Sequence, residues 1–369
     1  MIKNIQILRF FAAFAVVVNH AKPPIFNFPA HENLGSVWRV FVEMSFAGVD
    51  IFFVISGAIM AHSILNLPLM PRLGQAALRF YLHRLARIYA GWWPFFVFYG
   101  LAYVAVGSRN EKALVNSFFL IPQSLNLSLL PITWTLSFEL YFYTVLAFLL
   151  VFPRRALKPA ILICGTVVAA STLYFFLNDL YKPQRFGDVT MLHEFFLFPL
   201  TIEFAAGFLL YHFLRRSPDR SLWPWMMVTV MFGILATYYQ LTAVFMHPSG
   251  MAGFHYAPQR VLLVGGASVG LVACALLLTS SDGWFARKLA KLGDASYATY
   301  LGHIAVLYAL SMLAGRFAPI QRFPLTYYAF TLTAVVAYSW LHYSWIERPF
   351  YGWMKRTVAR GFQASSRRE

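Results

Sequence analysis

The sequence contains little charge and almost no cysteine. Of its 369 residues, 12% are charged and 59% are hydrophobic, whereas a soluble domain has about a quarter charged residues. Cys164 and Cys274 are the two cysteines, and each lies in an apolar run, which argues against a disulfide framework or a thiolate metal site. The sequence also lacks a Gly-rich phosphate loop, a paired-histidine metal motif and a nucleophile elbow. This composition excludes an ordinary soluble domain, and we expect no metal site.

Apolar stretches of about 20 residues recur along the whole chain, and each is long enough to cross a bilayer as a helix. Because lipid-exposed backbone must satisfy its own hydrogen bonds, we predict an all-α, polytopic integral membrane protein with about ten transmembrane helices. The predicted spans are 5–21, 47–66, 88–106, 132–152, 158–177, 192–214, 222–242, 257–279, 294–315 and 324–346. Residues 1–354 form one predicted membrane domain, and residues 355–369 form a basic, disordered cytoplasmic tail.

The chain has a net charge of +16, and its Lys and Arg residues gather in alternate loops. In a soluble protein this charge would suggest a nucleic-acid partner, but the positive-inside rule explains it here. Both termini are predicted to be cytoplasmic, since the loops that are then internal hold most of the basic residues. The expected partner is therefore the lipid bilayer and not a nucleic acid.

Ionisable residues inside the predicted spans are few, and each costs roughly 2.5–3.5 kcal/mol at a helix centre, so each needs an explanation. They are Arg9, His20, Asp50, Glu139, Glu203 and His303, with His342 and Glu347 near the end of a span.

Two of these residues share one face of the first predicted helix. Arg9 and His20 are separated by about 20° around the helix and about 16 Å along its axis. Asp50 begins the second span at about the depth of His20, where a carboxylate would fix the tautomer of the imidazole and stabilise the imidazolium. The alternatives are a snorkelling Arg9, an interfacial His20 and an N-cap role for Asp50.

The remaining polar residues allow more than one interpretation. Glu139 lies deep in its span and needs a partner or water. Glu203 and His303 either line the same cavity, pair with each other or are structural. Arg84 and Arg87 share a helix face, which fits a phosphate clamp as well as ordinary anchoring at the cytoplasmic surface.

Six segments, taken together, resemble the acyltransferase-3 family, the membrane-bound O-acyltransferases of bacterial surface polysaccharides. They are LRFFAAFAVVVNH (8–20), GVDIFFVISG (48–57), HRLARIY (83–89), WTLSFELYFY (134–143), GDASYATYLGH (293–303) and IERPF (346–350). The sequence departs from many members at Phe10, where they have Gly. Many relatives also carry a soluble esterase-like domain after the last span. This sequence ends soon after that span, so we expect a membrane domain that acts alone or with a separate partner.

The resemblance implies a multi-pass protein of the bacterial inner membrane that transfers an acyl group from cytoplasmic acyl-CoA to an extracytoplasmic glycan hydroxyl. Acetyl-CoA is the expected donor, and exopolysaccharide or O-antigen the expected acceptor. The expected catalytic residues are His20, Asp50 and Glu139, with Arg9, Arg84 and Arg87 on the donor and Trp134, Ser137 and His303 on the acceptor.

Several alternatives stay open on the sequence alone. Intramembrane acids, bases and histidines are also typical of proton-coupled secondary transporters, although no inverted repeat is visible. A component of polysaccharide export is a further alternative. Direct transfer and an acyl-histidine relay both fit the residues. The sequence leaves open whether the protein forms a homo-oligomer or joins polysaccharide assembly proteins.

Overall fold

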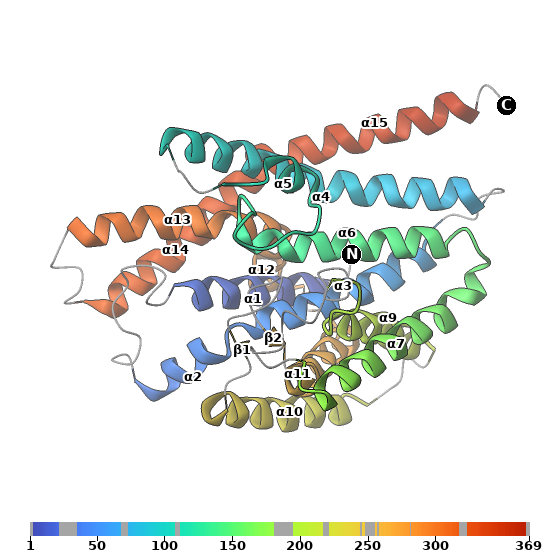
Figure 1. The fold of residues 1–369 in the computed structure, drawn as a ribbon, viewed down its shortest axis with the longest axis horizontal. Helices are drawn as coiled ribbons and strands as arrows, with labels where there is room; N and C mark the ends of the chain where they lie inside the picture. Colours follow the sequence, from blue (N-terminus) through green and yellow to red (C-terminus); the bar gives the residue numbers. More distant parts are fainter. Residues whose placement is uncertain are drawn as a thin grey trace. The chain divides into compact units, whose positions relative to one another are not determined.

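The structure is a computed structural model, which describes residues 3–21, 35–67, 73–107, 111–180, 195–216, 221–243, 246–247, 255–256, 258–280, 282–316 and 323–366. These residues are almost entirely helical, and two short strands, β1 (Met246–His247) and β2 (His255–Tyr256), pair with each other (Figure 1). The helices are α1 (Lys3–His20), α2 (Ser36–Met44), α3 (Ala47–Leu65), α4 (Leu73–Ala105), α5 (Leu114–Phe119), α6 (Trp134–Leu149), α7 (Leu157–Leu177), α9 (Thr201–Arg215), α10 (Trp223–Thr242), α11 (Pro258–Leu277), α12 (Trp284–Asp294), α13 (Ser296–Arg316), α14 (Pro324–His342) and α15 (Arg348–Ser366). Short 3₁₀ turns occupy Pro131–Thr133 and Arg154–Ala156, and a π-helical turn, Tyr343–Glu347, joins α14 to α15.

The predicted all-helical membrane character agrees with this structure. A helix overlaps every predicted span, and α4 begins well before its span of 88–106. Among the described residues, five helical segments are long and apolar enough to cross a membrane: Ala47–Leu65, Leu73–Ala105, Pro131–Leu149, Arg154–Leu177 and Pro258–Leu277. The protein is therefore a membrane protein, while the count of ten spans and the cytoplasmic position of both termini stay predictions.

The C-terminal tail differs from the expectation of disorder. Helix α15 extends to Ser366, so residues 355–366 are helical. Helix α15 packs along α4 (Figure 1), and the stacked rings of Phe350 and Trp353 lie 5.7 Å apart on its first turns. Packing of one helix face stabilises a helix that its basic composition alone would leave marginal. Residues 367–369 lie outside the described residues.

The chain divides into two compact units. The first comprises residues 1–61, 199–245 and 256–343, and the second residues 62–198, 246–255 and 344–369. In the first unit, α1 packs against α11, α12 and α13, α11 packs against α9 and α10, and α13 packs against α14. In the second unit, α4 packs against α5, α6 and α15.

Glycines allow the helices of the first unit to approach closely. A side chain on Gly57 of α3 would collide with the backbone carbonyl of Phe204 on α9, and one on Gly207 of α9 would collide with the carbonyl of Val54 on α3. Gly48 meets the Ala12 carbonyl of α1 in the same way. Small residues at such crossings are typical of membrane helices, because close backbone packing replaces the hydrophobic effect that drives association in water. These contacts hold the start of α3, and with it Asp50, against its neighbours.

Candidate functional site

Two histidines meet in the first unit. His20 is the last residue of α1, and its Nδ1 lies 3.3 Å from Nε2 of His303 on α13. The two ring centroids are 5.0 Å apart. His303 is fully buried, whereas His20 is partly exposed. The partly exposed His20 therefore contacts a histidine that solvent does not reach.

Backbone carbonyls define the tautomers of this pair. Nδ1 of His20 lies 2.9 Å from the Val16 carbonyl oxygen, and Nδ1 of His303 lies 3.1 Å from the Thr299 carbonyl oxygen. A carbonyl only accepts hydrogen bonds, so each Nδ1 carries its proton. Nε2 of His303 then presents a lone pair to the Nδ1–H of His20, and Nε2 of His20 is left unprotonated. In this state His20 has the form of a general base.

Asp50 does not orient His20, contrary to the sequence-based expectation. Its Oδ1 accepts from Nε of Arg260 at 2.9 Å, and its Oδ2 accepts from Nη2 of the same guanidinium at 2.6 Å. Both side chains are buried, at 0% and 1% exposure, and the guanidinium also lies over the Phe46 ring. A buried carboxylate needs an opposite charge, and a bidentate guanidinium satisfies it better than a neutral imidazole.

Arg260 belongs to this site, although the sequence analysis did not single it out. It lies in the first turn of α11, in the predicted eighth span. On the predicted topology that turn and Asp50 lie at the same outer depth, which was the signal available for pairing them.

Glu203 joins this ion pair and does not pair with His303. It lies in the first turn of α9 and is 2% exposed. Its carboxyl group interacts electrostatically with Asp50 and Arg260. A Cβ atom on Gly265 of α11 would lie only 2.8 Å from its Oε1. The buried cluster Asp50–Arg260–Glu203 therefore contains two acids and one base.

Arg9 is linked to helix α12 through a glutamine. Its Nη1 donates to Oε1 of Gln6 at 3.3 Å, and Nε2 of Gln6 donates to Oδ1 of Asp294 at the end of α12. A Cβ on Gly293 would collide with the Gln6 carbonyl, so α12 approaches α1 closely at this point. The Arg9 side chain is thus held near the contact between α1 and α12.

In the second unit, Arg84 and Glu139 are connected through a tyrosine. The Tyr143 hydroxyl donates to Oε1 of Glu139, and the Arg84 guanidinium lies 5.8 Å from the centre of the Tyr143 ring and 5.3 Å from that of Phe80. A carboxyl group deep in a membrane span needs a hydrogen-bonding partner, and Tyr143 is that partner for Glu139.

Arg87 forms an ion pair with Glu347, which follows the tenth predicted span. Its Nη1 lies 2.5 Å from Oε1 of Glu347, a fully buried carboxylate in the π-helical turn, and its guanidinium lies over the Tyr351 ring at 5.6 Å. The two arginines therefore differ in their contacts: Arg84 packs on aromatic rings, whereas Arg87 pairs with a buried carboxylate.

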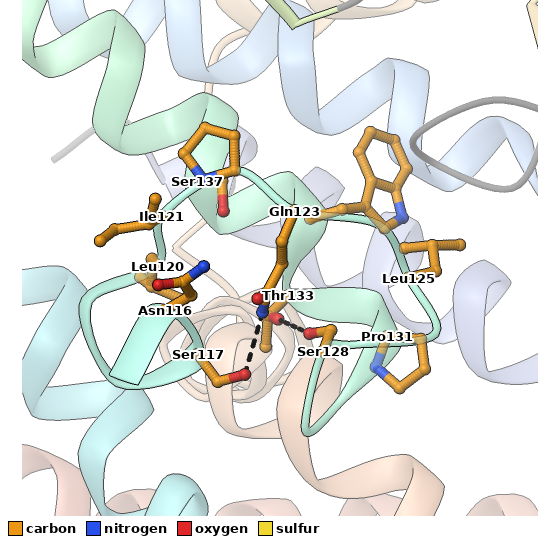
Figure 2. A pocket seen from close by; sticks show the side chains of 12 residues that line it. Asn116, Ser117, Leu120, Ile121, Gln123, Leu125, Ser128, Pro131, Thr133 and Ser137 are labelled. Atoms are coloured by element: carbon orange, nitrogen blue, oxygen red, sulfur yellow. Dashed lines mark hydrogen bonds between the residues drawn. The ribbon is translucent and has the colours of Figure 1, made fainter. Parts of the chain in front are cut away.

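Trp134 and Ser137 line one pocket in the second unit (Figure 2). His303, the third residue expected on the acceptor, is buried against His20 in the first unit, so its position suits it to orient His20 rather than to contact an acceptor. Within the described ranges, no group of three His, Cys, Asp or Glu side chains gathers as a metal site would require.

Comparison with known proteins shows which family the chain is similar to. A family model described as an acyltransferase domain matches residues 2–344. The chain is 29% identical over 316 residues to the exopolysaccharide production protein ExoZ of Rhizobium meliloti (strain 1021), covering 82% of this chain and 88% of that protein. It is 25% identical over 336 residues to nodulation protein 10 of Rhizobium leguminosarum bv. viciae, covering 83% of each. No solved structure matches the chain.

Proposed function

The chain belongs to the acyltransferase-3 family, and from this premise we propose that it transfers an acetyl group from cytoplasmic acetyl-CoA to a hydroxyl of an extracytoplasmic glycan, in a bacterial inner membrane. The observation that carries the proposal is the contact of His20 with His303, in which a partly exposed imidazole lies against a buried one and directs its Nδ1 at the Val16 carbonyl. The name of one relative, an exopolysaccharide production protein, supports exopolysaccharide as the acceptor.

In the proposed reaction, Nε2 of His20 removes the proton of the acceptor hydroxyl. The oxygen attacks the carbonyl carbon of the thioester, the new C–O bond forms and the C–S bond breaks. The leaving thiolate then takes the proton from the His20 imidazolium, giving the acetyl ester and free coenzyme A. His303 acts as a positioning residue, because its Nε2 lone pair and the Val16 carbonyl face the Nδ1–H of the imidazolium.

Charged groups of the protein have two separate roles in this account. Arg84, Arg87 and Arg9 are the proposed contacts for the donor phosphates, since guanidinium groups bind phosphates through charge-assisted hydrogen bonds. The Asp50–Arg260 pair holds α3 and α11 together instead of taking part in proton transfer. Glu139 keeps a proposed role in acceptor positioning through its contact with Tyr143.

One experiment separates this proposal from transport or export. Purified protein in nanodiscs is incubated with radiolabelled acetyl-CoA and deacetylated exopolysaccharide. An acetyltransferase converts the label into alkali-labile ester on the polysaccharide. The same protein in sealed lipid vesicles is tested for uptake of the label, and uptake without any ester, which a carrier would give, would overturn the proposal.

A further inference from the structure

Helix α12 is held against the start of α1 by contacts at both of its ends. Just before α12, Oδ1 of Asp282 accepts from Nζ of Lys3 at 3.0 Å. At its last turn, Oδ1 of Asp294 accepts from Nε2 of Gln6, and a Cβ on Gly293 would collide with the Gln6 carbonyl. These contacts fix α12 on α1, and with it the direction in which each face of α12 points.

The two sides of α12 differ in chemistry. At about 100° per residue, Ala286, Leu289 and Gly293 fall on one side, which includes the close contact with Gln6. The opposite side carries exposed residues, most of them basic, within about 100° of arc, and they are Trp284, Arg287, Lys288 and Lys291. We name these four residues the outer face of α12.

The outer face has an excess of positive charge. Among the described residues, neither Lys288 nor Lys291 forms an ion pair. Arg287 attracts the Asp282 carboxylate, but that carboxylate is also bonded to Lys3. The outer face therefore attracts anions from its surroundings.

The position of α12 in the chain brings it to a membrane surface. Helix α11 is long and apolar enough to cross a membrane and ends at Leu277, and α12 begins soon after it in the sequence, at Trp284. The end of α11 also lies at the start of α1, because Nδ2 of Asn4 donates to the Leu278 carbonyl at 2.7 Å. The outer face is therefore close to lipid headgroups.

Aromatic rings next to the cations favour a lipid over a soluble anion. Trp284 and Phe285 are 66% and 67% exposed, and Nζ of Lys288 lies 5.6 Å from the centre of the Trp284 ring. Helices that lie in the membrane interface combine basic side chains with such rings, because the rings enter the boundary of the acyl chains while the cations stay with the headgroups.

From these observations we propose that the outer face of α12 binds the phosphate groups of anionic phospholipids, such as phosphatidylglycerol, in the adjacent leaflet. Lys and Arg bind phosphates through charge-assisted hydrogen bonds, and each cation near an anionic membrane surface adds to the attraction. On the predicted topology this leaflet is the cytoplasmic one. Lipid binding at this face is independent of the proposed acyl transfer.

Hydrogen exchange of the α12 backbone amides, followed by mass spectrometry, tests this site locally. The full-length protein is placed in nanodiscs of phosphatidylcholine, alone or with an equal amount of phosphatidylglycerol. A ligand that binds only the folded helix slows the exchange of its amides. We expect phosphatidylglycerol to slow exchange in α12 at least about fivefold, the factor that corresponds to about 1 kcal/mol for one cation at an anionic surface.

Two charge-removing variants show whether the slowing depends on the outer face. The outer-face variant is Arg287→Gln with Lys288→Gln and Lys291→Gln. It should lose the slowing and keep the helix, because glutamine has a similar helix propensity and no charge. The matched control removes the same charge from exposed positions of α15 by Lys355→Gln with Arg356→Gln and Arg360→Gln. It should keep the slowing in α12.

Each other outcome would overturn the lipid site. Equal exchange in α12 in the two lipid mixtures would show that the outer face does not bind phosphatidylglycerol. Loss of the slowing in the α15 control as well would assign it to the overall charge of the protein. Slowing by coenzyme A in phosphatidylcholine nanodiscs, and not by phosphatidylglycerol, would assign the face to the donor. Thermal unfolding in detergent shows whether each variant folds, and Lys291→Gln alone decides if the outer-face variant does not.

Discussion

Nε2 of His303 lies 3.3 Å from Nδ1 of His20, and the buried ring thereby faces the proton-bearing side of the exposed one. With its Nδ1 protonated, His20 has the form of a base at Nε2. In the acyl-transfer account this arrangement assigns to a histidine the supporting position that a carboxylate occupies in many hydrolases.

Replacing His303 tests this supporting role. His303→Ala removes the lone pair facing His20, so kcat should fall by roughly 10–100-fold while the KM for acetyl-CoA stays unchanged. His303→Gln keeps an acceptor at that place and should recover part of the rate. Steady-state kinetics on the three proteins measure this difference, and equal losses in both variants would show that His303 only fills space.

The Asp50–Arg260 pair should govern stability. Asp50→Ala leaves a buried guanidinium without its carboxylate, which costs about 3–5 kcal/mol. The double variant Asp50→Ala with Arg260→Ala should be less destabilised than the two single changes predict together, because both charges of the pair are removed and only Glu203 of the cluster remains. Thermal unfolding in detergent provides the double-mutant cycle. Additive losses would contradict a direct pair.

The proposed donor contact predicts a defect specific for acetyl-CoA. Arg84→Ala should raise the KM for acetyl-CoA by roughly tenfold, because a charge-assisted hydrogen bond contributes about 1.5–3 kcal/mol, with little effect on kcat. Arg155→Ala, at an exposed arginine of the same unit, is the control. An unchanged KM in Arg84→Ala would remove this residue from the donor site.

The crossing of α3 and α9 gives a prediction about packing. Gly57→Ala would place its methyl group on the Phe204 carbonyl and should destabilise the protein by about 1–3 kcal/mol. Gly233 of α10 has open space around it, so Gly233→Ala should leave stability unchanged or raise it by up to about 1 kcal/mol. Similar melting temperatures for the two variants would argue against the close crossing.

The sequence predicted the helices well because long apolar runs decide them with little help from tertiary contacts. It did not predict α2, α5 or α12, which are shorter than a membrane span. Helix α12 in particular lies between the predicted spans 257–279 and 294–315, where the sequence analysis placed no helix.

Pairing between helices was harder to predict than helix position. Helical periodicity places Arg9 and His20 on one face, but it does not identify the neighbouring helix that this face meets. The depth of Asp50 was compatible with either His20 or Arg260, and the cost of an unpaired buried charge decides for Arg260. His303 appeared as an acceptor residue for the same reason, since only the packing of α13 on α1 brings it to His20.

The most direct test of the account is acetyl transfer by His20→Ala, measured with radiolabelled acetyl-CoA and deacetylated exopolysaccharide. His212→Ala, which removes a histidine from the last turn of α9, is the matched control. A general base contributes about 10²–10⁴-fold to a rate, so we predict that His20→Ala folds normally and loses at least about 100-fold of its transfer rate, while His212→Ala keeps wild-type activity. A folded His20→Ala protein that transfers acetyl at close to the wild-type rate would contradict the central claim.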